Sequence, residues 1–280
     1  MYRSNVSINE INSATHFDLT DMPYHGGSTL SSGALPKWDL FDGAFMIKRC
    51  SINEYGHQLT DAVNEELACL FCKALGIPAA QYRLVYIKYK DTETGDTIEA
   101  QAALTKIFGD LVHYRDVRRR MMLGEGTDAY LDFSEKFDIQ PALNDLLFLD
   151  YITNQSDRHS KNLGLVGNQM SPVFDSGACL FHDILDSELS ESYFDKVPIH
   201  KTFGKRLDAQ LIFALKHVHP GFSFVFNEAF IYARFLDSLD CVKHYYSTKR
   251  LTFIKSLVKG RLKHVGRFFA EAQSFRNSVG

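Results

Sequence analysis

One stretch of the chain decides the fold: Asp157-Arg-His-Ser-Lys-Asn162, with Phe174-Asp-Ser-Gly177 shortly after it. A run with helical character precedes the first motif, and short apolar runs after it predict a small hairpin. Asp157 and Asn162 then lie just before the hairpin, and Asp175 lies on its second strand. Three oxygen-bearing side chains are therefore expected to converge at one end of the hairpin.

Phosphoryl transfer requires a set of side chains of this kind. One carboxylate takes or orients the proton of the attacking hydroxyl, while a second carboxylate and an amide oxygen hold Mg²⁺ on the nucleotide phosphates. An Asp-x-x-x-x-Asn loop followed by another Asp has this division of labour. The alternative is a polar loop that caps a helix and carries a surface Asp. Either motif alone fits that alternative better, but the two together favour phosphoryl transfer.

The part of the chain before these motifs alternates between strand and helix patterns. We expect a strand at residues 43–48, and a helix that begins at Thr60 or Asp61 and ends at Gly76. Two further strands are predicted at residues 81–90 and 97–108, where a Gly/Asp-rich joint indicates a hairpin. The first 108 residues therefore read as a β-rich lobe with one helix.

The rest of the chain is helical in character. Helices are predicted at residues 112–122, 139–154, 207–217, 224–236 and 249–274. The hairpin, with strands at residues 163–166 and 172–174, is inserted among them. The predicted fold class is α+β, a two-lobed protein-kinase-like fold with a boundary between residues 108 and 109. A cleft is expected near residues 108–111.

The β-rich lobe also offers an ion pair. Lys48 ends a predicted strand, and Glu65 and Glu66 lie on the helix that follows. Kinase folds use a strand Lys paired with a helix Glu to fix a cation on the α/β-phosphates of the nucleotide. A lysine at a strand end is usually just solvated, and periodicity alone leaves open which glutamate faces it. A Ser/Gly-rich loop at residues 26–37 is suited to cover phosphates but matches no phosphate-loop spacing.

These motifs together resemble HipA-like serine/threonine kinases, whose fold is related to phosphatidylinositol kinases. Besides the two stretches quoted first, Ser32-Gly-Ala-Leu-Pro-Lys37 is similar to the family's Ser-Gly-Val-Gln-Pro-Lys segment. Asn64-Glu65 with Leu75-Gly-Ile-Pro78 is similar to its Asn-Glu helix, and favours Glu65 as the partner of the lysine. We expect a compact, CtkA-type member without the extra N-terminal subdomain of full-length HipA-type toxins.

The resemblance implies a role for each residue. Asp157 is implied as the catalytic base, His159 as a structural member of its loop, and Asn162 and Asp175 as Mg²⁺ ligands. The nucleotide-binding residues that it implies are Ser32, Gly33, Lys37, Lys48 and Glu65. It also implies autophosphorylation of a serine within residues 28–32. Leu35 stands where the family has Gln, which is a departure in the phosphate-covering loop.

The function predicted on this basis is an ATP- and Mg²⁺-dependent kinase that phosphorylates Ser or Thr hydroxyls of a protein. One alternative is a lipid or small-molecule kinase, which the Asp-Arg-His-x-x-Asn loop also suits. The other is a pseudokinase-like binding module that acts through partner contacts. The presence of the expected catalytic side chains argues against the binding module.

Composition excludes several other classes. The 280 residues are 45% hydrophobic with a formal net charge of -3, which excludes a disordered chain and makes nucleic acid an unlikely primary ligand. No apolar run reaches the roughly 20 residues of a transmembrane helix, and no signal-peptide pattern is present. Three of the five cysteines (Cys69, Cys72 and Cys179) lie in apolar runs, so reduced thiols and a cytoplasmic location are expected. An effector secreted without a signal peptide is the alternative.

Charge is distributed unevenly along the chain. Residues 243–280 hold nine basic residues and one acidic residue, a charge of +8, which leaves -11 for residues 1–242. An apolar stripe at helical spacing runs through the same segment. The segment is therefore expected to pack as a helix whose basic face is either simply solvated or binds an acidic partner or an anionic surface.

Overall fold

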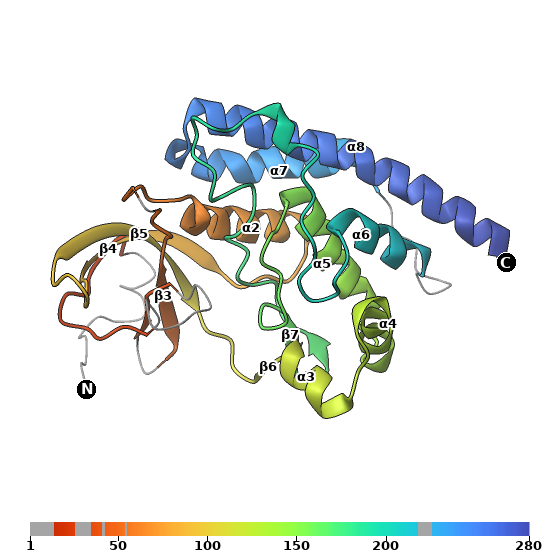
Figure 1. The fold of residues 1–280 in the computed structure, drawn as a ribbon, viewed down its shortest axis with the longest axis horizontal. Coiled ribbons are helices and arrows are strands. Elements are labelled where there is room, and N and C mark those ends of the chain that lie inside the picture. Colours follow the sequence, from red (N-terminus) through yellow and green to blue (C-terminus); the bar gives the residue numbers. More distant parts are fainter. Residues whose placement is uncertain (1–13, 26–34, 41–42, 54, 218–225, 280) are drawn as a thin grey trace.

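The structure is a computed structural model that describes residues 14–25, 35–40, 43–53, 55–217 and 226–279. Ser32, Gly33 and the segment 28–32, in which autophosphorylation is predicted, lie outside the described residues. The described part is a mixed α+β fold with a curled five-stranded sheet and seven α-helices. In Figure 1 the sheet occupies one end of the molecule and most helices lie beyond it.

The sheet has the strand order β1-β4-β5-β3-β2, in which β1 and β4 are parallel and the other pairs are antiparallel. The predicted strands are confirmed within a few residues, and the two outer strands were not predicted. The strands are β1 (His16–Asp18), β2 (Lys37–Leu40), β3 (Phe45–Arg49), β4 (Tyr82–Lys90) and β5 (Thr97–Lys106). Alternation of buried and exposed side chains along β3 and β4 presents one face of the sheet to the core.

Helix α2 (Asp61–Leu75) lies between the sheet and the other helices, as Figure 1 shows. It ends where the sequence predicts, because Gly76 adopts φ 75° and its N–H donates to the carbonyl groups of Cys72 and Lys73. The helix packs on β4 and β5 and also on α7 (Glu228–Val242). Val63, Leu67 and Phe71 are buried in these contacts. Helix α2 thus fixes the sheet to the helical part.

Most of the predicted helices are confirmed. The remaining described helices are α3 (Tyr114–Met121), α4 (Gly126–Lys136), α5 (Gln140–Thr153), α6 (Leu207–Lys216) and α8 (Thr248–Val279). The sequence did not predict α4, and α7 extends beyond its predicted end. The residues predicted to begin α7 lie partly outside the described segments. None of the described helices is both long and apolar enough to cross a membrane.

The prediction of a helix at residues 112–122 is wrong at its start. Residues Leu111–His113 form strand β6, which pairs antiparallel with β7 (Gly164–Val166). The two strands approach each other so closely that a Cβ on Gly164 would lie 2.3 Å from the carbonyl oxygen of Val112. A partner far away in the sequence therefore overrides the helical pattern, and α3 begins only after the strand. The predicted boundary at residues 108 and 109 falls in the connection between β5 and β6 and stays a prediction.

The second strand of the small hairpin is also not where the sequence predicts it. Strand β8 is Gln169–Met170, and residues 172–174 lie beyond it. Val173 instead pairs with the α2–β4 connection: its N–H donates to the carbonyl of Pro78 at 2.8 Å, and its carbonyl accepts from the Ala80 N–H at 2.8 Å. Asp175 therefore follows a segment that pairs with the α2–β4 connection, and it does not lie on the hairpin.

Candidate active site

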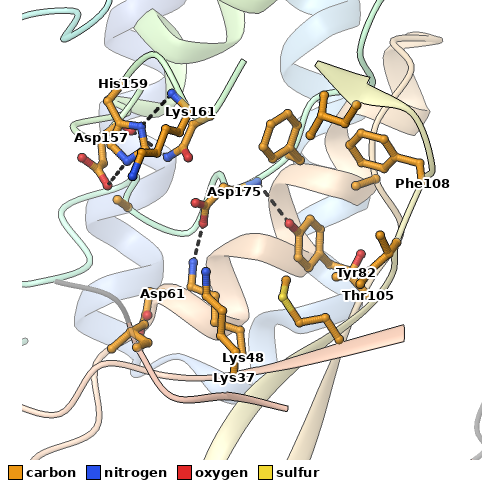
Figure 2. A pocket seen from close by; sticks show the side chains of 18 of the residues that line it. Lys37, Lys48, Asp61, Tyr82, Thr105, Phe108, Asp157, His159, Lys161 and Asp175 are labelled. Carbon is orange, nitrogen blue, oxygen red and sulfur yellow. Dashed lines mark hydrogen bonds and ion pairs between the residues drawn. The ribbon is translucent and has the colours of Figure 1, made fainter. Parts of the chain in front are cut away.

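A cavity of about 510 Å³ opens between the sheet and the helical part. The sequence-predicted residues that line it are Lys37, Lys48, Asp157, His159, Asn162 and Asp175. In Figure 2, Asp157 and His159 lie on one side of Asp175, and Tyr82, Thr105 and Phe108 lie on the other. The cavity therefore has a polar end and an aromatic end, with Asp175 between them.

Lys48 on β3 holds the two acidic groups of the site together. Its ammonium forms ion pairs with Glu65 Oε1 at 3.3 Å and with Asp175 Oδ1. Burial alone would lower the pKa of Lys48, but the carboxylates of Asp175 and Glu65 outweigh it and raise the pKa well above its usual value. Lys48 therefore stays charged at neutral pH.

Of the two adjacent glutamates on α2, Glu65 faces the site. Its Oε2 accepts a hydrogen bond from the Ser176 N–H at 2.7 Å, and the side chain is buried. Burial raises the pKa of Glu65 to about 7, an effect that Lys48 opposes. Glu66 points to the sheet instead, where its Oε2 accepts from the Leu84 N–H at 2.8 Å.

Asp175 adopts a backbone conformation that presents its carboxylate to the cavity. Its φ is 53°, in the left-handed region, and its N–H donates to the Tyr82 hydroxyl at 3.1 Å. Burial would raise the pKa of Asp175, but the nearby Lys48 ammonium holds it well below its usual range. The carboxylate is therefore ionised at neutral pH and suited to bind a cation.

The segment after Asp175 is fixed to α2 by a glycine and an asparagine. A Cβ on Gly177 would lie 2.7 Å from the carbonyl oxygen of Asp61, so only glycine permits this approach. The Asn64 amide donates to the carbonyl groups of Gly177 at 3.3 Å and Cys179 at 2.7 Å, and accepts from the Tyr246 hydroxyl at 2.7 Å. The side chains of both Asn64 and Glu65 on α2 therefore form hydrogen bonds with the backbone of this segment.

Arg158 joins the two motifs from beneath. Its guanidinium is buried and donates to the carbonyl groups of Asn162 at 2.9 Å and Phe174 at 2.6 Å. It also donates to the Ser176 hydroxyl and forms a bidentate pair with the buried Asp150 carboxylate on α5. No role was predicted for Arg158 from the sequence, although its position inside the first motif was a signal. This network aligns the two motifs at the cavity floor.

The loop from Asp157 to Asn162 is closed by its own hydrogen bonds. The Asn162 side-chain nitrogen donates to the Asp157 carbonyl at 2.9 Å, which leaves the side-chain oxygen as the atom able to bind a cation. The Asp157 carboxylate pairs with Lys201 at 2.6 Å through Oδ1. Its Oδ2 lies 3.8 Å from His159 Nε2. Lys201 was not found from the sequence, because it lies 44 residues away in a segment without a motif.

The donor set fits Mg²⁺ carried on a nucleotide. The described residues contain no cluster of three or more His, Cys, Asp or Glu side chains that holds a metal by itself. Asn162 and Asp175 offer one amide oxygen and one ionised carboxylate to the same cavity. Mg²⁺ typically binds through one or two carboxylates together with substrate phosphates and water. Two protein ligands are therefore enough if phosphates supply others.

The aromatic end of the cavity lies at the connection between β5 and β6. Its lining residues include Tyr82, Thr105, Ile107, Phe108 and Phe174. The rings of Phe108 and Phe174 meet edge to face, with their centroids 5.5 Å apart. Such a surface suits a planar apolar group such as a nucleobase. The cleft predicted near residues 108–111 thus coincides with one end of the cavity.

The basic C-terminal helix uses two of its arginines internally. Arg250 and Arg261 are buried, the first in a pair with Asp186 and the second in a hydrogen bond to Asn154 at 2.9 Å. Lys255, Lys259, Lys263 and Arg267 are exposed at intervals of four residues and form no ion pair with a described residue. These four residues are called the basic row below. They lie along one face of α8.

No protein-family model matches the sequence, and neither does any curated protein. Solved structures do match. The crystal structure of the Helicobacter pylori proinflammatory kinase CtkA is 14% identical, covers 91% of this chain and 98% of its own, and has a TM-score of 0.60. HipA from Shewanella oneidensis MR-1, in a complex with HipB and operator DNA, is 15% identical, covers 91% of this chain and 68% of its own, and has a TM-score of 0.40. The CtkA match confirms the predicted HipA-like kinase fold.

Proposed function

We propose that this protein is a kinase that uses ATP and Mg²⁺ to phosphorylate a Ser or Thr hydroxyl of a protein. The observation that carries the proposal is the convergence of three elements on one cavity. These are the Lys48–Glu65 ion pair, the ionised Asp175 and the loop from Asp157 to Asn162. A kinase-like fold without this convergence would support a binding module equally well.

In this proposal the nucleotide lies across the cavity. The adenine ring occupies the aromatic end near Thr105 and Phe108, and the phosphates extend toward Lys48 and Lys37. These two lysines lie opposite each other in the antiparallel pair of β2 and β3, which supports a shared role on the triphosphate. Asn162 and Asp175 hold Mg²⁺, which neutralises charge on the phosphates when it is bound.

Asp157 acts as the catalytic base. The acceptor hydroxyl oxygen forms a bond to the γ-phosphorus while the bond from that phosphorus to the β–γ bridging oxygen breaks. The hydroxyl proton passes to the Asp157 carboxylate, and ADP leaves with the electron pair of the broken bond. The partial exposure of Asp157, at 39%, supports this role because an acceptor on another molecule has to reach the carboxylate.

A lipid acceptor is the second candidate. The observation that favours it is the basic row, because four cations on one helix face are attracted to an anionic membrane. We propose that the basic row binds an anionic membrane surface. A protein acceptor or a lipid acceptor would then be phosphorylated at that surface. The basic row lies in a segment with a charge of +8, whereas residues 1–242 carry -11.

Radiolabelled ATP with Mg²⁺ tests the proposal and separates the candidates. Label on the protein itself or on an added protein, lost in Asp157→Asn, is expected for a protein kinase. Label only in extracted lipid would identify the lipid kinase. No label in either fraction, with no thermal shift on addition of ATP and Mg²⁺, would leave the binding module. Mass spectrometry of the labelled protein tests whether phosphate lies within residues 28–32.

A further inference from the structure

Lys201 contacts the proposed catalytic base although it belongs to neither motif. Its ammonium lies 2.6 Å from Asp157 Oδ1. The two residues are 44 positions apart, so the contact depends on how the chain returns to the cavity before α6. Nothing in the role assigned to the first motif accounts for a cation at this place.

The residues on either side of Lys201 are fixed to the interior. The Thr202 hydroxyl donates to the Arg158 carbonyl at 2.8 Å, so this segment is bonded directly to the loop that carries Asp157. The His200 ring is fully buried, lies 3.6 Å from the Asp150 carboxylate and stacks on Phe203 at 4.9 Å between ring centroids. Burial lowers the pKa of His200 to about 3, so its ring is neutral beside Asp150.

The backbone of this segment is a closed turn. The His200 N–H donates to the Lys205 carbonyl at 2.7 Å, and Ile199 and Arg206 form an isolated bridge. These backbone contacts, together with the hydrogen bond from Thr202 to the Arg158 carbonyl, fix the Cα of Lys201. Its side chain is nevertheless half exposed, at 53%, where it contacts Asp157.

The ion pair contributes little to stability, which points to another use. Ion pairs between exposed side chains typically contribute less than about 1 kcal/mol to folding. Asp157 and Lys201 are both substantially exposed, at 39% and 53%. The pair does, however, distinguish the two carboxylate oxygens. Oδ1 is held by the ammonium, while His159 Nε2, at 3.8 Å, is the one charged or polar partner of Oδ2 among the residues that the structure describes.

We infer that Lys201 is a positioning residue for phosphoryl transfer that binds Asp157 Oδ1 and directs Oδ2 to the acceptor hydroxyl. The inference rests on the proposed function. In the transfer step the acceptor oxygen bonds to the γ-phosphorus, the bond to the β–γ bridging oxygen breaks, and the acceptor proton moves to Oδ2. Lys201 itself neither gains nor loses a proton. It sets the orientation in which Asp157 meets the acceptor.

The test compares Lys201→Met, Lys201→Arg and the matched control Lys205→Met, a lysine on the same turn that does not contact Asp157. Lys201→Met is expected to lower kcat by about ten- to a hundredfold, because misplacement of a reacting group has effects of this size. KM for ATP and the thermal shift with ATP and Mg²⁺ stay unchanged, since the nucleotide contacts lie elsewhere. Lys201→Arg recovers most of kcat, and Lys205→Met behaves as the wild type.

A second comparison separates positioning from a merely structural role. In the Asp157→Asn background, Lys201→Met is expected to cause no further loss of the residual rate, because the group that Lys201 positions has been replaced. The inference is overturned if Lys201→Met retains the wild-type kcat, or if it lowers the rate by the same factor in both backgrounds. In those cases an active wild type leaves the kinase proposal standing. A wild type that transfers no phosphate overturns both.

Discussion

The two sides of the cavity hold their charges in different ways. On the nucleotide side, Lys48 and Glu65 are 15% and 1% exposed, and the fold itself brings their charges together. On the acceptor side, Asp157 and Lys201 are 39% and 53% exposed. Hydrogen bonds fix the backbone of the two segments that carry them, but their side chains remain exposed to solvent. The buried pair is thus part of the folded core, whereas the exposed pair is a contact between side chains that a substrate can rearrange.

This difference has a physical reason. The negative charge of the triphosphate has to be neutralised by groups that are already desolvated and oriented, because reorganising them during the reaction costs free energy. An acceptor on another molecule needs an open approach, so the base has to lie near the surface. The Arg158–Asp150 network reconciles both needs, because it is buried but bonds to the carbonyl groups of both motifs.

The largest effect is expected from breaking that network. Arg158→Met leaves the Asp150 carboxylate buried without a cation, which typically costs about 3–5 kcal/mol. Urea unfolding measures this loss. The matched control is Arg206→Met, since Arg206 forms an exposed pair with Asp208 and is expected to contribute less than about 1 kcal/mol. Equal losses in the two variants would refute the distinction between buried and exposed pairs.

Asp175→Asn is expected to lower the rate of phosphate transfer by about 10²- to 10³-fold, the range for losing one electrostatic contact to a developing charge. The variant keeps the size of the side chain, so thermal unfolding in the absence of ligand shows whether the fold persists. Asp240→Asn on α7 is the control, because Asp240 is exposed and lies outside the cavity lining. Full activity of Asp175→Asn would remove this carboxylate from the mechanism.

Glu65 makes stability depend on pH. Its pKa is raised from 4.5 to about 7 in the folded protein, so between these values the folded state binds more protons than the unfolded state. The contribution of Glu65 to stability is therefore present below pH 4.5 and falls as pH rises to 7. Glu65→Gln is expected to lack this fall. Parallel stability curves for the variant and the wild type across that interval would show that Glu65 does not titrate there.

Charge reversal in the basic row is expected to have the smallest effect on the protein itself. Lys255→Glu and Lys259→Glu leave ATP turnover and unfolding unchanged, because neither side chain forms an ion pair with a described residue. Each reversal removes at least one attraction of about 1 kcal/mol to phosphatidylserine-containing vesicles, measured by sedimentation. Lys90→Glu on β4 is the control. Binding that is unaffected by either reversal would exclude this row as the membrane contact.

Local sequence patterns predicted much of the fold and the candidate site. Gly76 marked the end of α2, and the spacing of Asp157, Asn162 and Asp175 predicted that the three converge, as they do in one cavity, although Asp175 does not lie on the hairpin where it was expected. Contacts between distant segments were not predictable in this way. Strand β6 depends on its pairing with β7, and no local pattern shows that a partner will arrive. Lys201 was missed for the same reason, because its turn carries no motif and gains its position from Arg158.

The transfer of labelled phosphate from ATP, by the wild type and by Asp157→Asn, tests whether this protein is a kinase with Asp157 as its base. We expect Mg²⁺-dependent transfer by the wild type, and a rate lower by about 10²- to 10⁴-fold in the variant, the usual contribution of a general base. Both proteins are expected to show the same thermal shift with ATP and Mg²⁺, because Asp157 lies on the acceptor side. Equal transfer by the two proteins would exclude Asp157 as the catalytic base, and no transfer by a wild type that binds ATP would exclude kinase activity.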